Sequence, residues 1–151
     1  MINQFTNTKS RSLQEWIAKY EQKTGEEVVF PRGFVTYWLP ERGFAQLKVD
    51  AEGSILMIHM MCGDIRFWLD MAKLMCIQNN IDHIASICTR KIESYIRVFN
   101  WEVVEEFNVD GFKRFICKDG AGCKIIISPK GVDELTGDVS YWVTQYLKER
   151  L

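Results

Sequence analysis

The stretch Ile55-Leu56-Met57-Ile58-His59-Met60-Met61-Cys62-Gly63-Asp64 sets the architecture of this chain. Its first seven residues form an apolar run with the length of a buried strand. Residues 65–78 then carry apolar side chains three and four positions apart, which is typical of an amphipathic helix. A short apolar run follows at residues 84–88. This order predicts a strand, a helix and a second strand that pairs in parallel with the first.

Upstream of this unit, the sequence predicts a helix and three strands. Ser12 and Glu15 have the spacing of a capping box, so we expect an amphipathic helix over residues 12–23. Strand-like runs follow at residues 28–30, 34–39 and 43–49. Because turn residues separate them, we expect the last two to form an antiparallel meander with the apolar strand at residues 54–61.

Downstream, Thr89 is a predicted N-cap for a helix over residues 90–99, and Asn100 a left-handed C-cap. Two hairpins are predicted from the runs at residues 101–107, 112–117 and 123–127, and a closing helix from residues 138–150. The sequence therefore predicts one mixed α/β domain over residues 1–151, with residues 1–10 irregular. Its twisted sheet would be mainly antiparallel with one central parallel pair, and helices would cover both faces.

Composition excludes several classes of partner. With 19 basic and 20 acidic residues, the formal net charge is -1, which lacks the basic excess of a nucleic-acid-binding protein. The sequence contains no apolar run of the roughly 20 residues that a membrane span requires. The five cysteines form no CxxC pair and lie mostly within apolar runs, which predicts buried, reduced thiols. We therefore expect a cytoplasmic protein that binds neither nucleic acid nor membrane.

The element order resembles that of the GNAT (GCN5-related N-acetyltransferase) fold. Residues 55–75 and 84–106 carry the resemblance, and Asn100-Trp101 is similar to the Gly-Phe or Gly-Trp step that leaves the family's fourth helix. The resemblance implies transfer of an acetyl group from acetyl-CoA to an amine of a small molecule or peptide. A homodimer is a further expectation. The cofactor would contact the backbone of four residues and the side chain of one basic residue, namely Met60, Met61, Cys62, Gly63 and Arg66.

The sequence departs from the family at the cofactor loop. GNAT enzymes bind the pyrophosphate with Arg/Gln-x-x-Gly-x-Gly/Ala, whereas this chain has the single glycine Gly63, followed by Asp64. The carboxylate would repel a pyrophosphate, unless Arg66 compensates. The alternative interpretation of Asp64 is a plain helix N-cap without a ligand.

Two residues are candidates for proton transfer. His59 would accept a proton from the amine, although a hydrogen-bonded structural histidine is the alternative. Tyr95 would donate a proton to the leaving thiolate, but the family's tyrosine position falls on Ile96, one residue further along. Neither histidine has a metal-ligand spacing, so no metal site is expected. Two other functions stay open, a non-catalytic GNAT-like scaffold or interaction protein and a binder of some other small acidic ligand.

Overall fold

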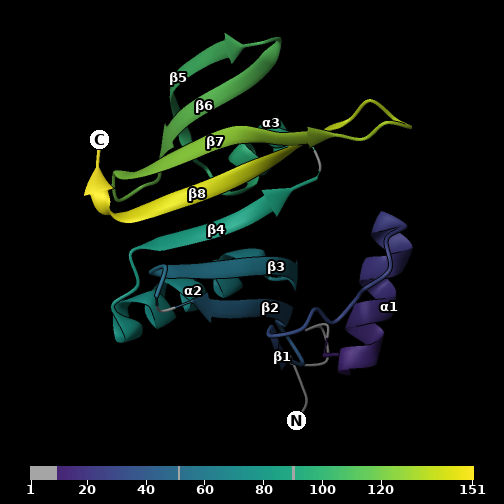
Figure 1. Ribbon diagram of the computed structural model, residues 1–151. Coiled ribbons are helices and arrows are strands. Elements are labelled where there is room, and N and C mark those ends of the chain that lie inside the picture. Colours follow the sequence, from purple (N-terminus) through teal and green to yellow (C-terminus); the bar gives the residue numbers. More distant parts are fainter. Residues whose placement is uncertain (1–9, 51, 90) are drawn as a thin grey trace. The chain divides into compact units, whose positions relative to one another are not determined.

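The computed structural model describes residues 10–50, 52–89 and 91–151. In this part of the chain, three helices and eight strands give the mixed α/β class that the sequence predicts (Figure 1). The strands follow the order β1-β2-β3-β4-β8-β7-β6-β5 in a mixed sheet, which is mostly antiparallel with one parallel pair. The elements are α1 (Leu13–Thr24), β1 (Val35–Leu39), β2 (Gly43–Asp50), β3 (Ile55–Gly63), α2 (Ile65–Asn79), β4 (His83–Cys88), α3 (Ile92–Val98), β5 (Glu102–Val109), β6 (Phe112–Lys118), β7 (Cys123–Val132) and β8 (Val139–Arg150).

Contacts divide the described chain into two compact units. The first unit contains residues 10–48 and 58–72, with α1, β1, most of β2, most of β3 and the first half of α2. The second unit contains residues 49–57 and 73–151, except the two internal residues that are not described. The prediction of a single domain stays a prediction, and the expected irregular segment lies mostly outside the described residues.

In the first unit, α1 begins and ends where the sequence predicts. Ser12 and Glu15 exchange backbone and side-chain hydrogen bonds in a capping box. Gly25 ends the helix with a φ of 73°, a left-handed conformation that suits glycine. The helix packs through Trp16 against Phe44 of β2 and Cys62 of β3. Burial of such apolar side chains stabilises the unit by roughly 1.5–3 kcal/mol each.

In the second unit, antiparallel strands form most of the sheet. β4 pairs with β8, β8 with β7, β7 with β6 and β6 with β5. Helix α3 packs through Ile92 and Ile96 against the apolar face of β6, β7 and β8 (Figure 1). Asp110 and Gly111 both have positive φ, of 54° and 83°, in the predicted hairpin turn between β5 and β6. Asn100 has a φ of 56°, as predicted.

The prediction of a closing helix over residues 138–150 is wrong, because this segment is the strand β8. Burial alternates along it, with Tyr141, Val143 and Gln145 buried and Trp142 36% exposed. A helix with the predicted apolar face would bury Trp142 with Val143. Aromatic and β-branched residues fit a pleated surface well. Here β8 completes the backbone hydrogen bonds of both β4 and β7, which a helix could not do.

Two smaller predictions are also wrong. Residues 28–30 form no strand; Val28 packs in the core beside α1, and its N–H donates to a carboxylate oxygen of Glu21. The segment is therefore held by side chains instead of a sheet. Thr89 does not cap α3, whose N-cap residue is Lys91 without a capping side-chain hydrogen bond. Arg90, the first residue of the predicted helix, lies outside the described residues.

Candidate functional site

The turn between β3 and α2, where the sequence predicts a cofactor loop, is closed by hydrogen bonds within the first unit. Oδ1 of Asp64 accepts from the N–H of Phe67 at 3.1 Å, so Asp64 caps the helix. The carbonyl oxygen of Arg42 accepts from the N–H of Asp64 at 2.9 Å and from Nε1 of Trp68 at 2.7 Å. The N–H groups of Asp64 and Phe67 are thus already bonded to protein acceptors.

Gly63 is needed for a close approach of two backbone segments. Its φ is 96°, and a Cβ at this position would lie 2.5 Å from the carbonyl oxygen of Arg42. Gly43 faces it with a φ of 90°, and a Cβ there would overlap the carbonyl oxygen of Cys62. The presence of glycine at position 63 is therefore explained by packing against the start of β2, without a bound phosphate.

Charges in this turn are also paired. The guanidinium of Arg42 forms an ion pair with the carboxylate of Asp64 and lies over the ring of Phe67, 4.8 Å from its centroid. The N–H of Phe67, followed by the Arg42 side chain, holds the pKa of Asp64 below its ordinary value. The carboxylate consequently stays charged at neutral pH, at the helix end that a pyrophosphate would approach. These residues do not fit the pyrophosphate of acetyl-CoA.

The other predicted cofactor contacts have separate surroundings. The side chain of Met60 and that of Cys62 pack in the core cluster with Trp16, and Met61 is half-buried in the same strand. Arg66 is exposed on the first turn of α2. Its charge contributes to the lowered pKa of Asp64, as the last of several causes. Met60, Cys62 and Gly63 thus make structural contacts within the first unit.

His59 is held in one orientation by a buried glutamine of β2. Nδ1 of His59 lies 2.9 Å from Oε1 of Gln46, whose Nε2 donates to the carbonyl oxygen of Val29 at 2.9 Å. Because the glutamine oxygen can only accept, Nδ1 of His59 carries the proton and Nε2 is the basic nitrogen. Partial burial lowers the pKa of His59 below its ordinary value. The exposed imidazole is therefore neutral at pH 7 and able to accept a proton.

Gln46 was not a candidate from sequence, although one signal was visible. It is an amide within the apolar run Phe44-Ala45-Gln46-Leu47, and its side chain is 0% exposed. A buried polar side chain needs hydrogen-bond partners, so its presence in a strand indicates a specific contact. The identity of that contact depends on the pairing of β2 with its neighbours, which the sequence does not specify.

Tyr95 lies in the second unit, whereas His59 lies in the first. Its hydroxyl is 3.1 Å from Oγ of Ser86 in β4, and its ring packs edge-on against Phe99 and Trp101. Burial raises the pKa of Tyr95 to about 12. A phenol with this pKa stays protonated at neutral pH but is a weak proton donor. The contacts of Tyr95 are those of a core residue in α3.

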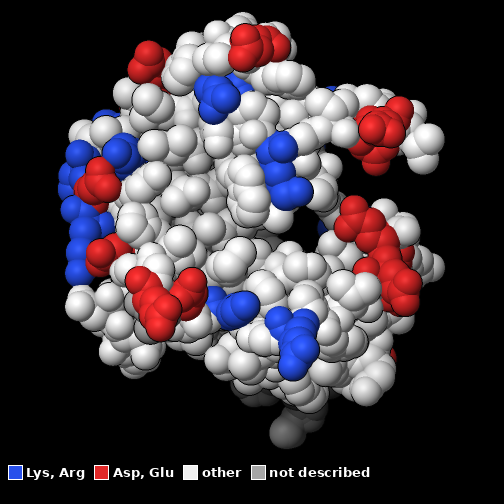
Figure 2. Space-filling view, in the orientation of Figure 1, with Lys and Arg blue, Asp and Glu red and all other residues white. Residues whose placement is uncertain are grey.

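Charged side chains of both signs are mixed on the face in Figure 2. At the ends of β7 and β8, Lys124 pairs with Glu149 at 2.7 Å and Lys148 with Asp82 at 2.8 Å. All five cysteines are buried, as predicted, and none of them is in a disulfide bond. Within residues 10–50, 52–89 and 91–151, no cluster of potential metal ligands occurs, and no helix is long and apolar enough to cross a membrane.

Comparisons with protein-family models, with curated proteins and with solved structures found no match to this chain. Function is therefore argued from the residues and their contacts.

Proposed function

We propose that this chain is a GNAT-like scaffold or interaction protein that does not use acetyl-CoA at the start of α2. One observation carries the proposal, the carboxylate of Asp64, which caps the helix and pairs with Arg42. If the chain has the family's fold, this carboxylate lies at the helix start that would face the pyrophosphate. The GNAT likeness of the fold is part of the proposal and rests on the order of elements from α1 to β6.

A thermal melt with acetyl-CoA, and with CoA and ATP as controls, tests this proposal. A ligand at about 100 times its dissociation constant would add roughly 2.7 kcal/mol and raise the midpoint by roughly 5–10 °C in a chain of this size. We expect no rise with millimolar acetyl-CoA. A rise that occurs with acetyl-CoA and CoA but not with ATP would contradict the proposal and restore the predicted cofactor site.

The outermost strand of the sheet supports a role in protein interaction. β5 is the last strand in the sheet order, and all eight of its residues are exposed. An outer strand presents backbone N–H and C=O groups to which another chain can add. The predicted homodimer would use such a surface. Light scattering of the purified chain measures its mass, and a monomeric mass across the micromolar range would contradict the homodimer.

The orientation of His59 favours a second candidate function, N-acyl transfer to an amine. Gln46 leaves Nε2 of His59 as an unprotonated, accessible base, which could take the proton of an amine acceptor. Since the turn at Asp64 does not fit the pyrophosphate, an acyl donor would have to bind elsewhere. The alternative role of His59 is structural, because the same hydrogen bond also satisfies a buried amide.

Turnover measurements with His59→Gln distinguish these roles, and His83→Gln is the matched control. If His59 is the base, release of CoA from acetyl-CoA in the presence of an amine panel should fall by roughly 10²-fold in His59→Gln and remain in His83→Gln. The rate of the wild-type protein should rise with pH as His59 loses its proton. No amine-dependent release in the wild-type protein, or equal rates in both variants, would exclude this second function.

A further inference from the structure

The sheet of the second unit has one face that a helix covers and one that is open. Helix α3 packs on the covered face, against Phe115, Ile127 and Val143. Figure 1 shows this helix behind the strands, so the viewer sees the opposite face, and no described helix of the second unit crosses it. This open face extends over five adjacent strands, in the order β4-β8-β7-β6-β5. Its side chains are therefore accessible to another molecule where the neighbouring strands do not bury them.

Large apolar side chains point out from the open face. Trp142 of β8 is aligned with Ile87 of β4, and Ile126 of β7 with Ile116 of β6. Each of the four is next in sequence to a buried residue of the covered face, so it points to the other side of the sheet. Ile87 is 40% exposed and Trp142 36%, and the other two are half-buried. Figure 2 shows mostly uncharged surface over β4, β8 and β7. An exposed apolar patch of this kind marks an interaction site.

Two side chains of opposite charge also lie on the open face. The strand pairing aligns Arg114 of β6 with Phe107 of β5, and Glu105 of β5 with Ile116. Neither Arg114 nor Glu105 forms an ion pair or a side-chain hydrogen bond within the described residues. The face is therefore complementary in charge to a second copy of itself. A two-fold axis between these residues brings Arg114 of one copy to Glu105 of the other, and the reverse.

The size of the open face is sufficient for a specific contact between two copies. Five strands about 4.8 Å apart give a width of about 24 Å, and the seven residues of β6, at about 3.4 Å each, give a length of about 24 Å. Two such faces together bury about 1,200 Å², which is at the lower end of the range for specific protein–protein interfaces. A dimer with a dissociation constant in the micromolar range fits this area.

We infer that the open face binds a second copy of the chain, sheet against sheet, in a two-fold symmetric dimer. The apolar side chains around Trp142 and Ile126 are buried between the copies, and Arg114 pairs with Glu105 of the other copy. A strongly basic or strongly acidic partner would leave one of these two charges unpaired. The inference rests on the interaction role proposed above and assigns its partner. Its test does not involve acetyl-CoA, so the dimer can fail while the proposal about Asp64 stands.

A charge exchange tests the contact by analytical ultracentrifugation between about 1 and 200 μM. We expect the wild-type protein to form a dimer, and Arg114→Glu or Glu105→Arg alone to raise its dissociation constant at least about fivefold, because like charges then meet twice. The double variant, with both substitutions, should return to within about threefold of the wild-type value. A wild-type protein that stays monomeric, or a double variant as weak as the single ones, would overturn the inference.

The apolar part of the contact has its own pair of variants. Trp142→Ser should raise the dissociation constant at least about tenfold, because buried tryptophans carry much of the energy of protein interfaces. Ile77→Ser is the matched control, since Ile77 is 76% exposed on α2 and should leave the constant unchanged. Circular dichroism checks that each variant is folded. A dimer that Trp142→Ser and the charge variants do not weaken would place the contact elsewhere, for example at the β5 edge, and would also overturn the inference.

Discussion

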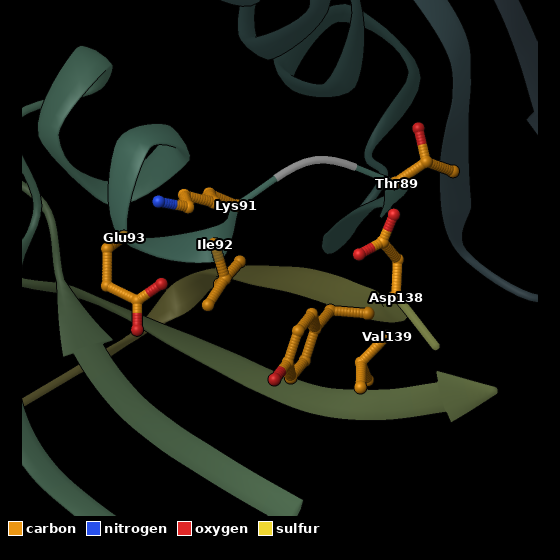
Figure 3. A pocket seen from close by; sticks show the side chains of 7 residues that line it. Thr89, Lys91, Ile92, Glu93, Asp138 and Val139 are labelled. Atoms are coloured by element: carbon orange, nitrogen blue, oxygen red, sulfur yellow. The ribbon is translucent and has the colours of Figure 1, made fainter. Parts of the chain in front are cut away.

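The start of α2 and the cavity beside α3 differ in how their polar groups are used. At the start of α2, the Asp64 carboxylate, the Arg42 guanidinium and the Arg42 carbonyl oxygen are all bonded to neighbouring protein groups. At the cavity, which is lined by Thr89, Lys91, Ile92, Glu93, Asp138, Val139 and Tyr141 (Figure 3), the Tyr141 hydroxyl and the Asp138 carboxylate make no hydrogen bond or ion pair within the described chain, and the hydroxyl reaches solvent. Polar groups near a helix start are available to a ligand only when the fold leaves them unpaired.

Glycine shows the same contrast. Gly63 is the residue that suggests a phosphate site, yet backbone atoms of Arg42 and Gly43 fill the space beside its Cα. The cavity beside α3 contains no glycine among its lining residues. A glycine therefore identifies a position where the backbone comes close to other atoms. The sequence does not show whether those atoms belong to a ligand or to the protein itself.

Gly63→Ala should give the largest effect. The new Cβ would lie 2.5 Å from the carbonyl oxygen of Arg42, and the backbone has a φ of 96°. We expect a loss of at least about 3 kcal/mol in the free energy of unfolding, measured by urea denaturation. Gly25→Ala is the control, because Gly25 also has positive φ but open space around it, and it should cost about 1 kcal/mol. Similar losses in both variants would mean that the close approach of Gly63 to Arg42 is unimportant.

Asp64→Ala removes the cap of α2 and the partner of Arg42. We expect the free energy of unfolding to fall by about 1–2 kcal/mol. Asp64→Asn keeps an oxygen that can accept from Phe67 and loses only the exposed ion pair, so it should cost less than about 1 kcal/mol. If Asp64→Ala is as stable as the wild-type protein, the turn is not held by the hydrogen bonds described above.

The pH dependence of stability should identify the same carboxylate. Because the folded state lowers the pKa of Asp64 from 3.8, its contribution to stability is present above that value and is lost as the pH falls through the folded-state pKa. The free energy of unfolding of Asp64→Asn should therefore differ from that of the wild-type protein at pH 6 and approach it near pH 2. Urea titrations at both pH values measure this difference, and a constant gap would contradict the assignment.

Tyr141→Phe should have the smallest effect. Its hydroxyl makes no hydrogen bond among the described residues and is not one of their buried unpaired atoms, so it reaches solvent, and its removal should change the free energy of unfolding by less than about 0.5 kcal/mol. Tyr95→Phe is the matched control, because it breaks the hydrogen bond to Ser86 and leaves a buried hydroxyl unpaired, at a cost of about 1 kcal/mol. A larger loss in Tyr141→Phe than in Tyr95→Phe would reverse the comparison between paired and unpaired groups.

Local patterns predicted the elements whose signals lie within a few residues. The capping box at Ser12, the left-handed Asn100 and the Asp110-Gly111 turn occur as expected, because each depends on the conformation of its own segment. β8 was predicted as a helix, because Val139, Val143 and Tyr146 have helical spacing, although Val139 and Val143 also share one face of a strand. The positions of β4 and β7 on either side of it settled the choice.

The candidate sites were less predictable, because they depend on which residues meet. The sequence identified Asp64 as a cap and His59 as an imidazole in a strand, but not Arg42 or Gln46 as their partners. Those partners are 22 and 13 residues away along the chain. The cavity is another example. Thr89 and Ile92 line it together with Asp138 and Tyr141, although the strands β5, β6 and β7 lie between these two pairs in the sequence.

The sequence by itself determined the mixed α/β class, the caps of α1, the left-handed Asn100, the Asp110-Gly111 turn and the burial of the cysteines. These follow from periodicity and from the conformational preferences of single residues. Only the tertiary structure decided that Gly63 faces Gly43, that Asp64 is paired, that residues 139–150 form a strand and that the Tyr141 hydroxyl opens on a cavity. The physical reason is that pairing of polar groups and close packing depend on contacts between segments distant in sequence, which no local pattern specifies.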